Sequence, residues 1–465
     1  MDNLRKNSHR LEGNTLAILD SSGIREACDI HEDRLSFLDA VRGASLASIT
    51  PSPPTWKMYD AILRILKEGN SLELAVASFQ LLTDLEKRYP SVYLRESDNL
   101  ETDSSGAWVP VVNKEAWSPF IVETRNCSGE ASQLCRDSKS LLNSASFSIL
   151  TEEIAIGGHS TIKIVQNMLL FQYVVRSLEA DFLPRHTFCK ETFNWDFLKE
   201  SVLCKLVAYR KMNYKSIVHG CMSIISTRFF HKTNICFKDL SDKDGISADL
   251  PTSCYVGLSF AFPEIQRKTC DAAQKLLILI MELDVIRKEA DTFGLTSRSD
   301  GFRIPIIDTV LDELTYNKDQ LSPFLEAFGE PKWKLEIILL YFGKYYSRPS
   351  TRTRRTNTSP NNETFEGILN CFSNPVISGG ILRKVTSEVA CLLLAQAFKC
   401  YLSLQHDPKN VAFVAEKIGS STLPEICNGL VAALKNLRKF DDSLELTSFQ
   451  KQALTTAAAL ASMKS

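Results

Sequence analysis

Apolar residues recur three or four positions apart over most of the chain, which is the spacing of one face of an α-helix. Near the N-terminus, Leu35, Leu38 and Val41 predict a first helix. Thr55 is a suitable N-cap for a second helix, and a third is expected to end near Pro90. Consecutive helices with short connectors are typical of an antiparallel helical stack.

The same spacing predicts further helices along the rest of the chain: 164–178, 195–209, 214–228 and 269–290. Pro305, Pro323 and Pro331 each lie near the predicted start of a later helix, where a proline is tolerated. Thr422 followed by Glu425 is typical of a capping box. The pattern predicts about twelve to fifteen helices and no convincing series of strands.

Several segments interrupt this pattern. The region 95–160 is rich in Ser, Asn, Asp and Glu, although Trp108, Trp117 and Phe120 are aromatic positions that could pack back onto the body. The apolar stretch between Pro251 and Pro263 is assigned to no element. The predicted organisation is a flexible N-terminus, N-terminal helices, a largely disordered insertion, and a helical body with two loops: 1–30, 31–94, 95–160, and 161–465 with loops at 231–268 and 347–364.

The predicted fold class is all-α, as an irregular helical solenoid of the armadillo or HEAT type. This prediction rests on the lengths of the helices and connectors, because no self-similar repeat is visible in the sequence. A large globular helical fold is the alternative.

The composition agrees with a helical protein that has a sizeable core. The 20 glycines among 465 residues are fewer than the roughly 7% expected on average, and 44% of residues are hydrophobic, which excludes wholesale disorder. With 54 basic and 55 acidic residues, the net charge is −1, which argues against a surface built throughout for nucleic acid. A local basic patch is still compatible with this balance.

The cysteines and the apolar runs predict a soluble intracellular protein. Several of the 13 cysteines, including Cys204, Cys391 and Cys400, lie within apolar helical patterns, as reduced buried thiols do. The N-terminus lacks the apolar core of a signal peptide. The longest strongly apolar run, Leu276–Met281, is far shorter than the roughly 20 residues needed to span a bilayer.

The sequence contains no recognisable catalytic or metal-binding signature. The motifs GxSxG, GxGxxG and HExxH and the P-loop are missing. The pairs Cys127 with Cys135 and Cys391 with Cys400 lack zinc-ligand spacing and a second half. The cluster Gly157-Gly158-His159-Ser160 is interpreted as a linker turn, because no strand precedes it. We therefore expect no catalytic, cofactor-binding or metal-binding residues, and an enzyme without a known motif is a minor alternative.

The sharpest charge feature is a group of four arginines in the predicted loop 347–364: Arg348, Arg352, Arg354 and Arg355. Such a site could bind phosphate, an acidic partner groove or a nuclear import receptor. The alternative is a loop that only aids solubility. Trp333 between two lysines could form a stacking platform, but its helical spacing with Ile337 and Leu340 favours a core position.

A set of short motifs, in collinear order over most of the chain, carries a resemblance to a known family: Glu32–Leu35, Leu38–Arg42, Met58–Ile62, Leu74–Leu82, Met281–Asp284, Thr296–Arg298, Leu311–Tyr316, Pro331–Ile337 and Arg352–Thr356. Together they resemble the plant negative regulators of systemic acquired resistance. Residues 95–160 match this family poorly, and residues 231–268 look like added material.

The resemblance implies an armadillo-like helical protein of the nucleus that represses pathogenesis-related genes and has no enzymatic activity. It implies a role similar to the helical regulatory subunits of the complex built on structural-maintenance-of-chromosomes proteins five and six, which serves DNA repair by homologous recombination. The expected partners are subunits of that complex, including another helical regulatory subunit, with at most weak or indirect contact to DNA. No membrane, cofactor or small-molecule substrate is implied. A direct DNA-binding transcriptional repressor is the alternative.

Overall fold

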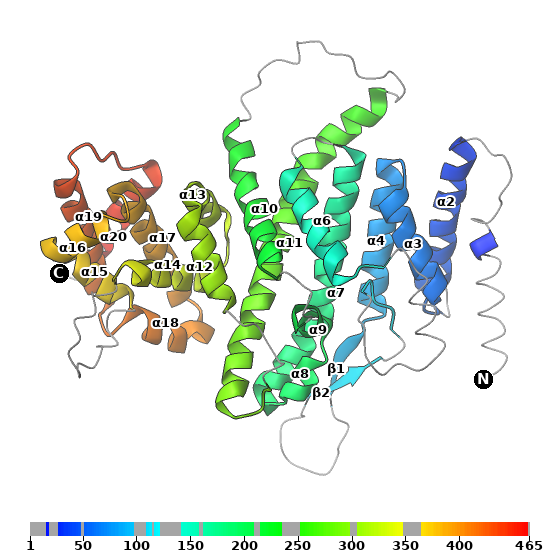
Figure 1. Cartoon of the computed structure of the whole chain (residues 1–465), viewed down its shortest axis with the longest axis horizontal. Coiled ribbons are helices and arrows are strands. Elements are labelled where there is room, and N and C mark those ends of the chain that lie inside the picture. The colour runs from blue at the N-terminus through cyan, green and yellow to red at the C-terminus, as the bar shows by residue number, and fades with distance from the viewer. Residues whose placement is uncertain are drawn as a thin grey trace. The chain divides into compact units, whose positions relative to one another are not determined.

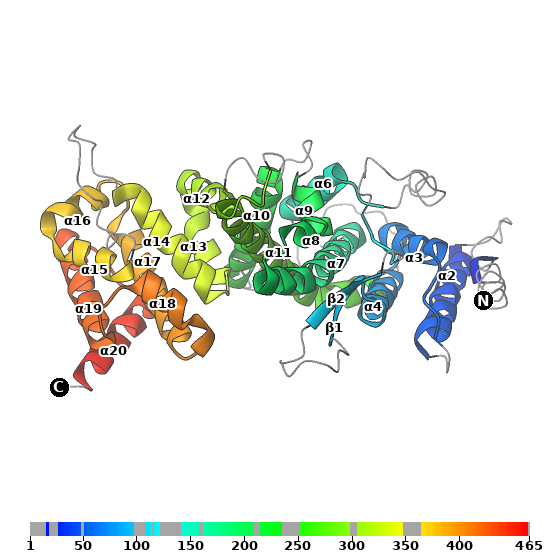
Figure 2. The ribbon, with the colours of Figure 1, turned by 90° about the horizontal axis from the view of Figure 1, so that it is seen from below.

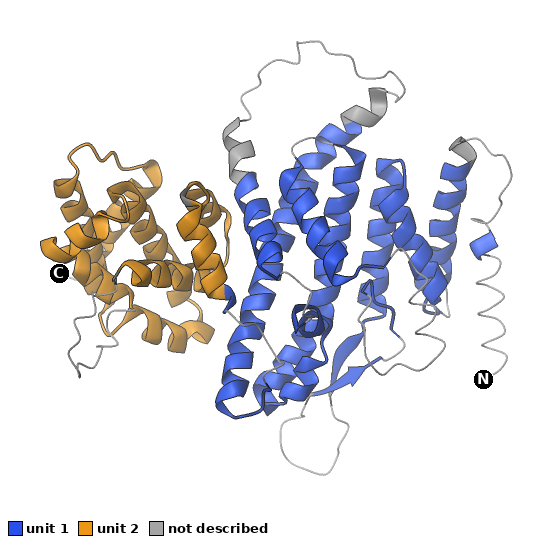
Figure 3. Cartoon of the chain, viewed as in Figure 1, with its two compact units in different colours: residues 1–306 blue, residues 307–465 orange. Residues whose placement is uncertain are grey.

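The computed structural model divides the chain into two compact units, residues 1–306 and 307–465 (Figure 3). The structure describes these residues: 15–17, 27–47, 51–96, 108–113, 116–120, 141–157, 161–208, 214–234, 252–297, 305–346 and 364–463. Within them almost all regular structure is helical, and the sheet that they contain has two strands (Figure 1). The prediction of a mostly α-helical protein is therefore confirmed.

The first unit begins with the three predicted helices: α2 (Ala27–Arg42), α3 (Trp56–Glu68) and α4 (Leu72–Arg88). A short π-helix, η1 (Gly43–Ala47), follows α2. The Thr55 hydroxyl caps α3 by accepting a hydrogen bond from the Met58 amide at 3.4 Å, and Ser71 caps α4 in the same way. These local caps explain why the sequence pattern located both helix starts.

Residues 95–160 contain more structure than the sequence predicts. Strand β1 (Val92–Glu96) pairs antiparallel with β2 (Trp108–Val112), and α6 (Ser144–Ile156) packs against two longer helices. The prediction of a largely disordered insertion is wrong for these elements. Phe147, Leu150 and Ile154 form a buried helix face, but the serines around them make the segment look like a polar linker in the sequence. The segments 97–107 and 121–140 lie outside the described residues.

Long helices form the centre of the first unit. Among the described residues of the first unit, four helices follow α7 (Ile162–Thr192): α8 (Trp195–Lys199), α9 (Val202–Ala208), α10 (Tyr214–Asn234) and α11 (Thr252–Thr292). Helix α7 contacts α3, α4, α6, both strands, α8, α9 and α11, whereas α10 packs on α6 and α11 (Figures 1 and 2). The predicted helix 195–209 is therefore two short helices, α8 and α9. They separate at Ser201, whose hydroxyl caps α9 by accepting from the Cys204 amide.

The prediction of a loop at 231–268 is wrong for two parts of this range. Residues 231–234 form the end of α10, and residues 252–268 form the first part of α11. The proline at position 263 lies inside α11, although a proline removes one helical hydrogen bond. Leu258 and Ile265 on either side of it are buried, and Gln172 of α7 donates a hydrogen bond to the Ile265 carbonyl at 3.0 Å. Packing therefore overrides the local signal of the proline.

All regular secondary structure in the described residues of the second unit is helical. Its elements are α12 (Ile306–Tyr316), α13 (Lys318–Ala327), α14 (Pro331–Tyr346), α15 (Phe365–Ser373), α16 (Pro375–Leu382), α17 (Ser387–Gln405), η3 (Pro408–Asn410), α18 (Val411–Ile418), α19 (Leu423–Phe440) and α20 (Ser448–Ser462). Helix α17 is long and apolar enough to cross a membrane, but it packs against α13, α14, α18, α19 and α20 and most of it is buried. It is the central core helix of this unit.

Two of the predicted helix starts in this unit are confirmed and one is wrong. The capping box of Thr422 and Glu425 is present, and α14 begins at Pro331. The predicted start at Ser322-Pro323 lies inside α13, because burial of Leu321 and Phe324 on both sides holds the helix through the proline. Trp333 is 3% exposed, which confirms its assignment to the core.

Candidate functional site

The predicted arginine site belongs to the segment between Tyr346, the last residue of α14, and Thr364, the N-cap of α15. Arg348, Arg352, Arg354 and Arg355 all lie outside the described residues. The arginine loop therefore stays a prediction.

The described cysteines are not arranged for metal chemistry. No group of three metal-ligating side chains occurs in the part of the chain that the structure describes. Buried free thiols are found at Cys189, Cys204, Cys221, Cys270, Cys371, Cys391, Cys400 and Cys427. Burial raises the pKa of Cys391 to about 12 and that of Cys400 to about 11, so both thiols are protonated at neutral pH. The pair Cys127 and Cys135 lies outside the described residues.

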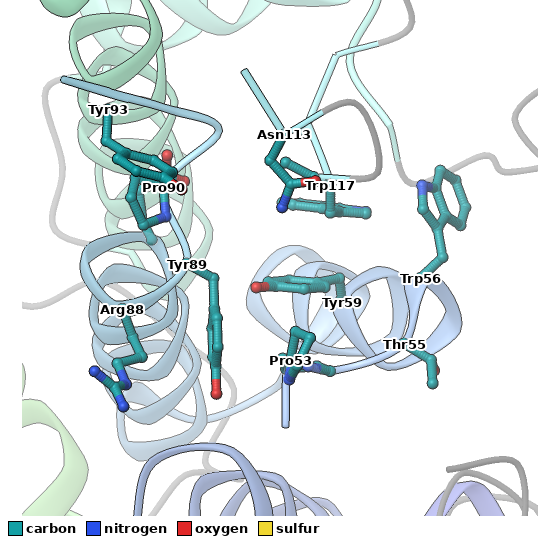
Figure 4. A pocket seen from close by; sticks show the side chains of 13 residues that line it. Pro53, Thr55, Trp56, Tyr59, Arg88, Tyr89, Pro90, Tyr93, Asn113 and Trp117 are labelled. Atoms are coloured by element: carbon teal, nitrogen blue, oxygen red, sulfur yellow. The ribbon is translucent and has the colours of Figure 1, made fainter. Parts of the chain in front are cut away.

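A pocket of about 640 Å³ lies in the first unit, where the start of α3, the end of α4 and the base of the β-hairpin meet (Figure 4). This volume falls in the range of roughly 300–1,000 Å³ that is usual for ligand pockets. Prolines and large aromatic side chains form much of its wall, including Pro53, Tyr59, Tyr89, Tyr93 and Trp117. We refer to this cavity as the aromatic pocket.

Stacked rings build the inner wall of the aromatic pocket. The rings of Tyr59 and Trp117 stack with centroids 4.8 Å apart and planes 6° from parallel. Trp117 also stacks on Tyr173 of α7, with a distance of 6.3 Å between the ring centroids. The sequence had suggested that Trp117 could pack back onto the body, and these contacts confirm it. Its indole N–H is buried and has no hydrogen-bond partner among the described residues. A buried donor without a partner calls for an explanation.

The outer wall comes from the end of α4. The Tyr89 hydroxyl donates a hydrogen bond of 2.8 Å to the Ser45 carbonyl of the π-helix, which holds the end of α4 in place. Figure 4 shows Tyr89 and Tyr93 on one side of the pocket and Tyr59 and Trp117 on the other. The pocket therefore has two walls that are held in place, one by the Tyr89 hydrogen bond and the other by the stacking of Tyr59 on Trp117.

One acidic side chain, Glu86 of α4, contributes to the lining. Its carboxylate accepts a long hydrogen bond of 3.5 Å from the Tyr173 hydroxyl and forms no ion pair with any described residue. Burial raises the pKa of Glu86 to about 7, although the positive charge of Arg176 and the Tyr173 hydrogen bond act in the opposite direction. The carboxyl therefore titrates close to neutral pH instead of near 4.5.

None of these pocket residues was a site candidate from the sequence. Glu86 follows the ordinary pattern of an acidic residue on a solvated helix face, and Tyr59 follows that of a core residue. The signal that could have found the pocket is weak: prolines and aromatic residues are frequent at 51–59 and 89–93. Only the folded chain brings these segments to Trp117.

The fold and the pocket together define a mostly helical protein that carries a ligand-sized aromatic recess. Comparison with known families is more specific. Residues 91–330 match the SNI1 middle domain, and residues 346–465 match the SNI1 C-terminal domain. The chain therefore belongs to the SNI1 family. The middle-domain match spans both 95–160 and 231–268, two segments that contain none of the short motifs by which the sequence resembles the family.

A curated relative agrees with this assignment. The chain is 38% identical over 450 residues to the Negative regulator of systemic acquired resistance SNI1 of Arabidopsis thaliana, covering 96% of this chain and 93% of the relative. The comparison with solved structures gives no match.

Proposed function

We propose that this chain is a negative regulator of systemic acquired resistance in plants. The observation that carries the proposal is the 38% identity to the Arabidopsis regulator over 96% of the chain. Identity of this extent reaches across both helical units, so the whole protein is comparable with the relative. The relative's name is that of a regulator, which favours a regulatory role over a catalytic one.

We further propose that the chain acts in the nucleus as a scaffold or regulatory subunit of the structural-maintenance-of-chromosomes five/six complex, in DNA repair by homologous recombination. The motifs that resemble this family support the idea. An irregular armadillo-like arrangement of the helices is part of the proposal, since stacked helices offer extended surfaces to partners.

Complementation tests the regulatory role. In a plant that lacks its own family member, expression of this chain should restore low basal expression of pathogenesis-related genes, measured by quantitative transcript analysis. Unchanged high expression, with the protein present in normal amount, would contradict the proposal.

Affinity purification tests the scaffold role. The tagged chain, purified from plant nuclei, should recover the two chromosome-maintenance proteins and a second helical regulatory subunit by mass spectrometry. Recovery of the chain alone as a free monomer would refute membership of the complex. The two experiments are independent: failed complementation would refute the regulatory role alone, and failed purification would refute membership of the complex alone.

The arginine loop is the proposed contact for an acidic partner or an import receptor. Its four arginines changed together to Gln should lower complex recovery or nuclear import while leaving the melting temperature nearly unchanged, because surface changes usually alter stability by within about 0.5 kcal/mol. A matched control changes four exposed cations of α19 and α20 to Gln: Lys435, Arg438, Lys439 and Lys451. A foreign nuclear signal on the loop variant separates import from assembly. Normal import and assembly of the loop variant would show that the loop is only a connector.

A further inference from the structure

The aromatic pocket contains a carboxyl group whose surroundings favour a positively charged ligand. Glu86 is desolvated, and although the positive charge of Arg176 acts on its carboxylate, no described residue forms an ion pair with it. Removing a carboxylate from water is costly unless a positive group or several donors replace the water. The single long hydrogen bond from Tyr173 replaces little of it.

The rings around the pocket are suited to the same ligand. The faces of Tyr and Trp rings attract ammonium and guanidinium groups, and the attraction strengthens when the site is shielded from water. Tyr89 and Tyr93 lie across the pocket from the stacked pair of Tyr59 and Trp117 (Figure 4). Stacking covers both faces of Trp117 and the inner face of Tyr59, so a cation that enters the pocket would meet the rings of Tyr89 and Tyr93 and the carboxylate of Glu86.

The size of the pocket and its single carboxylate argue against a lone metal ion as the occupant. A calcium or magnesium ion requires about six oxygen ligands, whereas Glu86 supplies the one carboxylate in the lining. A cavity of about 640 Å³ is large for a lone ion and suits a side chain with part of its backbone.

We propose that the aromatic pocket binds a single basic side chain, a lysine or arginine presented by a partner polypeptide, between its tyrosine rings and the carboxylate of Glu86. Arg88, which is exposed and also lines the pocket, argues for a polypeptide. A polyamine with several charges would be repelled by Arg88, whereas a peptide can place an acidic or neutral neighbour beside it. Binding by the purified chain would hold whether or not the chain joins the proposed complex.

Fluorine NMR on the full chain tests this site. The protein has five tryptophans, so labelling with 5-fluorotryptophan yields a simple spectrum, in which Trp56→Phe and Trp117→Phe identify the two pocket signals. The probe is the peptide acetyl-Gly-Glu-Lys-Gly-amide. The matched probe replaces the lysine by norleucine, which keeps the aliphatic stem and removes the charge.

The lysine peptide should shift both pocket signals to saturation and leave Trp195 and Trp333, which are buried elsewhere, unmoved. The norleucine peptide should bind at least about tenfold more weakly, as expected for loss of a charged hydrogen bond. Equal binding of the norleucine peptide would overturn the proposal, and so would tighter binding of spermidine or unmoved pocket signals.

Two variants on α4 distinguish recognition from a structural effect. Glu86→Gln should weaken the lysine peptide at least about tenfold, while Asp84→Asn, the same charge change on an exposed residue of the same helix, should weaken it less than about twofold. Unchanged fluorine signals of Trp195 and Trp333, which are buried away from the pocket, show that both free variants are folded. Wild-type affinity in Glu86→Gln would overturn the proposal.

The pH dependence provides a readout that packing alone would not move. The groups that act on Glu86 are Arg176, Tyr173 and Asp181 of α7 and Tyr59 of α3, and burial raises the pKa of both tyrosines far above neutrality. Affinity for the lysine peptide should therefore rise with pH through about 7 as Glu86 ionises. The rise should be absent in Glu86→Gln, and a rise of equal size there would overturn the role of Glu86.

Discussion

Replacing Asp181 by Ala should loosen the attachment of two short helices to α7. The Arg185 Nε atom lies 3.1 Å from an Asp181 carboxylate oxygen, and both side chains are 7% exposed. The second Asp181 oxygen accepts a hydrogen bond of 2.7 Å from the Val202 amide at the start of α9. Arg185 donates to the Phe197 carbonyl of α8 at 3.0 Å and lies 4.8 Å from the centre of the Phe197 ring. The ion pair therefore holds α8 and α9 to α7.

The expected cost follows from the burial of this pair. Removing one partner of a buried ion pair costs about 3–5 kcal/mol, because the other charge stays out of water without compensation. At about 1.4 kcal/mol for each factor of ten, local opening should become roughly a hundredfold to several thousandfold more frequent. The matched control is Asp271→Ala, whose pair with Arg267 is 44% and 46% exposed and should contribute less than about 1 kcal/mol.

Hydrogen exchange measured by mass spectrometry can detect the local opening of α8 and α9, because it reports on each peptide of the chain separately. Peptides that cover residues 195–208 should exchange at least about a hundredfold faster in Asp181→Ala, while Asp271→Ala stays near wild type. The double variant Asp181→Leu, Arg185→Met should restore most of the protection, since it removes both charges and keeps apolar volume. Acceleration of less than tenfold in Asp181→Ala would refute the reasoning.

Three further changes have defined outcomes. In urea unfolding, Glu86→Gln should stabilise the first unit by up to about 3 kcal/mol at pH 8 and by little below pH 4.5. The reason is that the pKa of Glu86 is raised in the folded state, so the wild-type protein loses stability as pH rises from 4.5 through about 7. An equal effect at both pH values would contradict this. Gly419→Ala should cost about 1–3 kcal/mol in urea unfolding of the second unit, since φ is +108° there and the new Cβ would meet the Glu366 carboxylate; no loss would show that the loop relaxes freely. Thr422→Ala should cost about 1 kcal/mol by the same measurement through loss of the capping box, and a neutral result would mean that the cap is frayed in solution.

The amino-acid sequence by itself determined the helical class and many helix starts. The reason is that these features are local: an apolar stripe needs only residues three or four positions apart, and a cap needs only the next turn. Thr55, Pro331 and the pair Thr422 and Glu425 were located correctly for this reason. The core position of Trp333 follows from the same periodicity.

The tertiary structure alone decided where local signals are overruled. Pro263 and Pro323 carry the local signal of a helix boundary, yet both lie inside helices whose buried neighbours compensate for a missing hydrogen bond. Helix α6 was missed because its serines look like linker, and only α7 and α10 make its apolar face a core face.

The aromatic pocket was equally invisible in the sequence. Glu86, Tyr59 and Trp117 belong to segments that meet only after α3, α4 and the base of the hairpin have packed on α7. The raised pKa of Glu86 depends on how much water that packing removes, and no window of the sequence around residue 86 contains this information. Helix formation depends on near neighbours, whereas the solvation of a carboxylate depends on every segment that covers it.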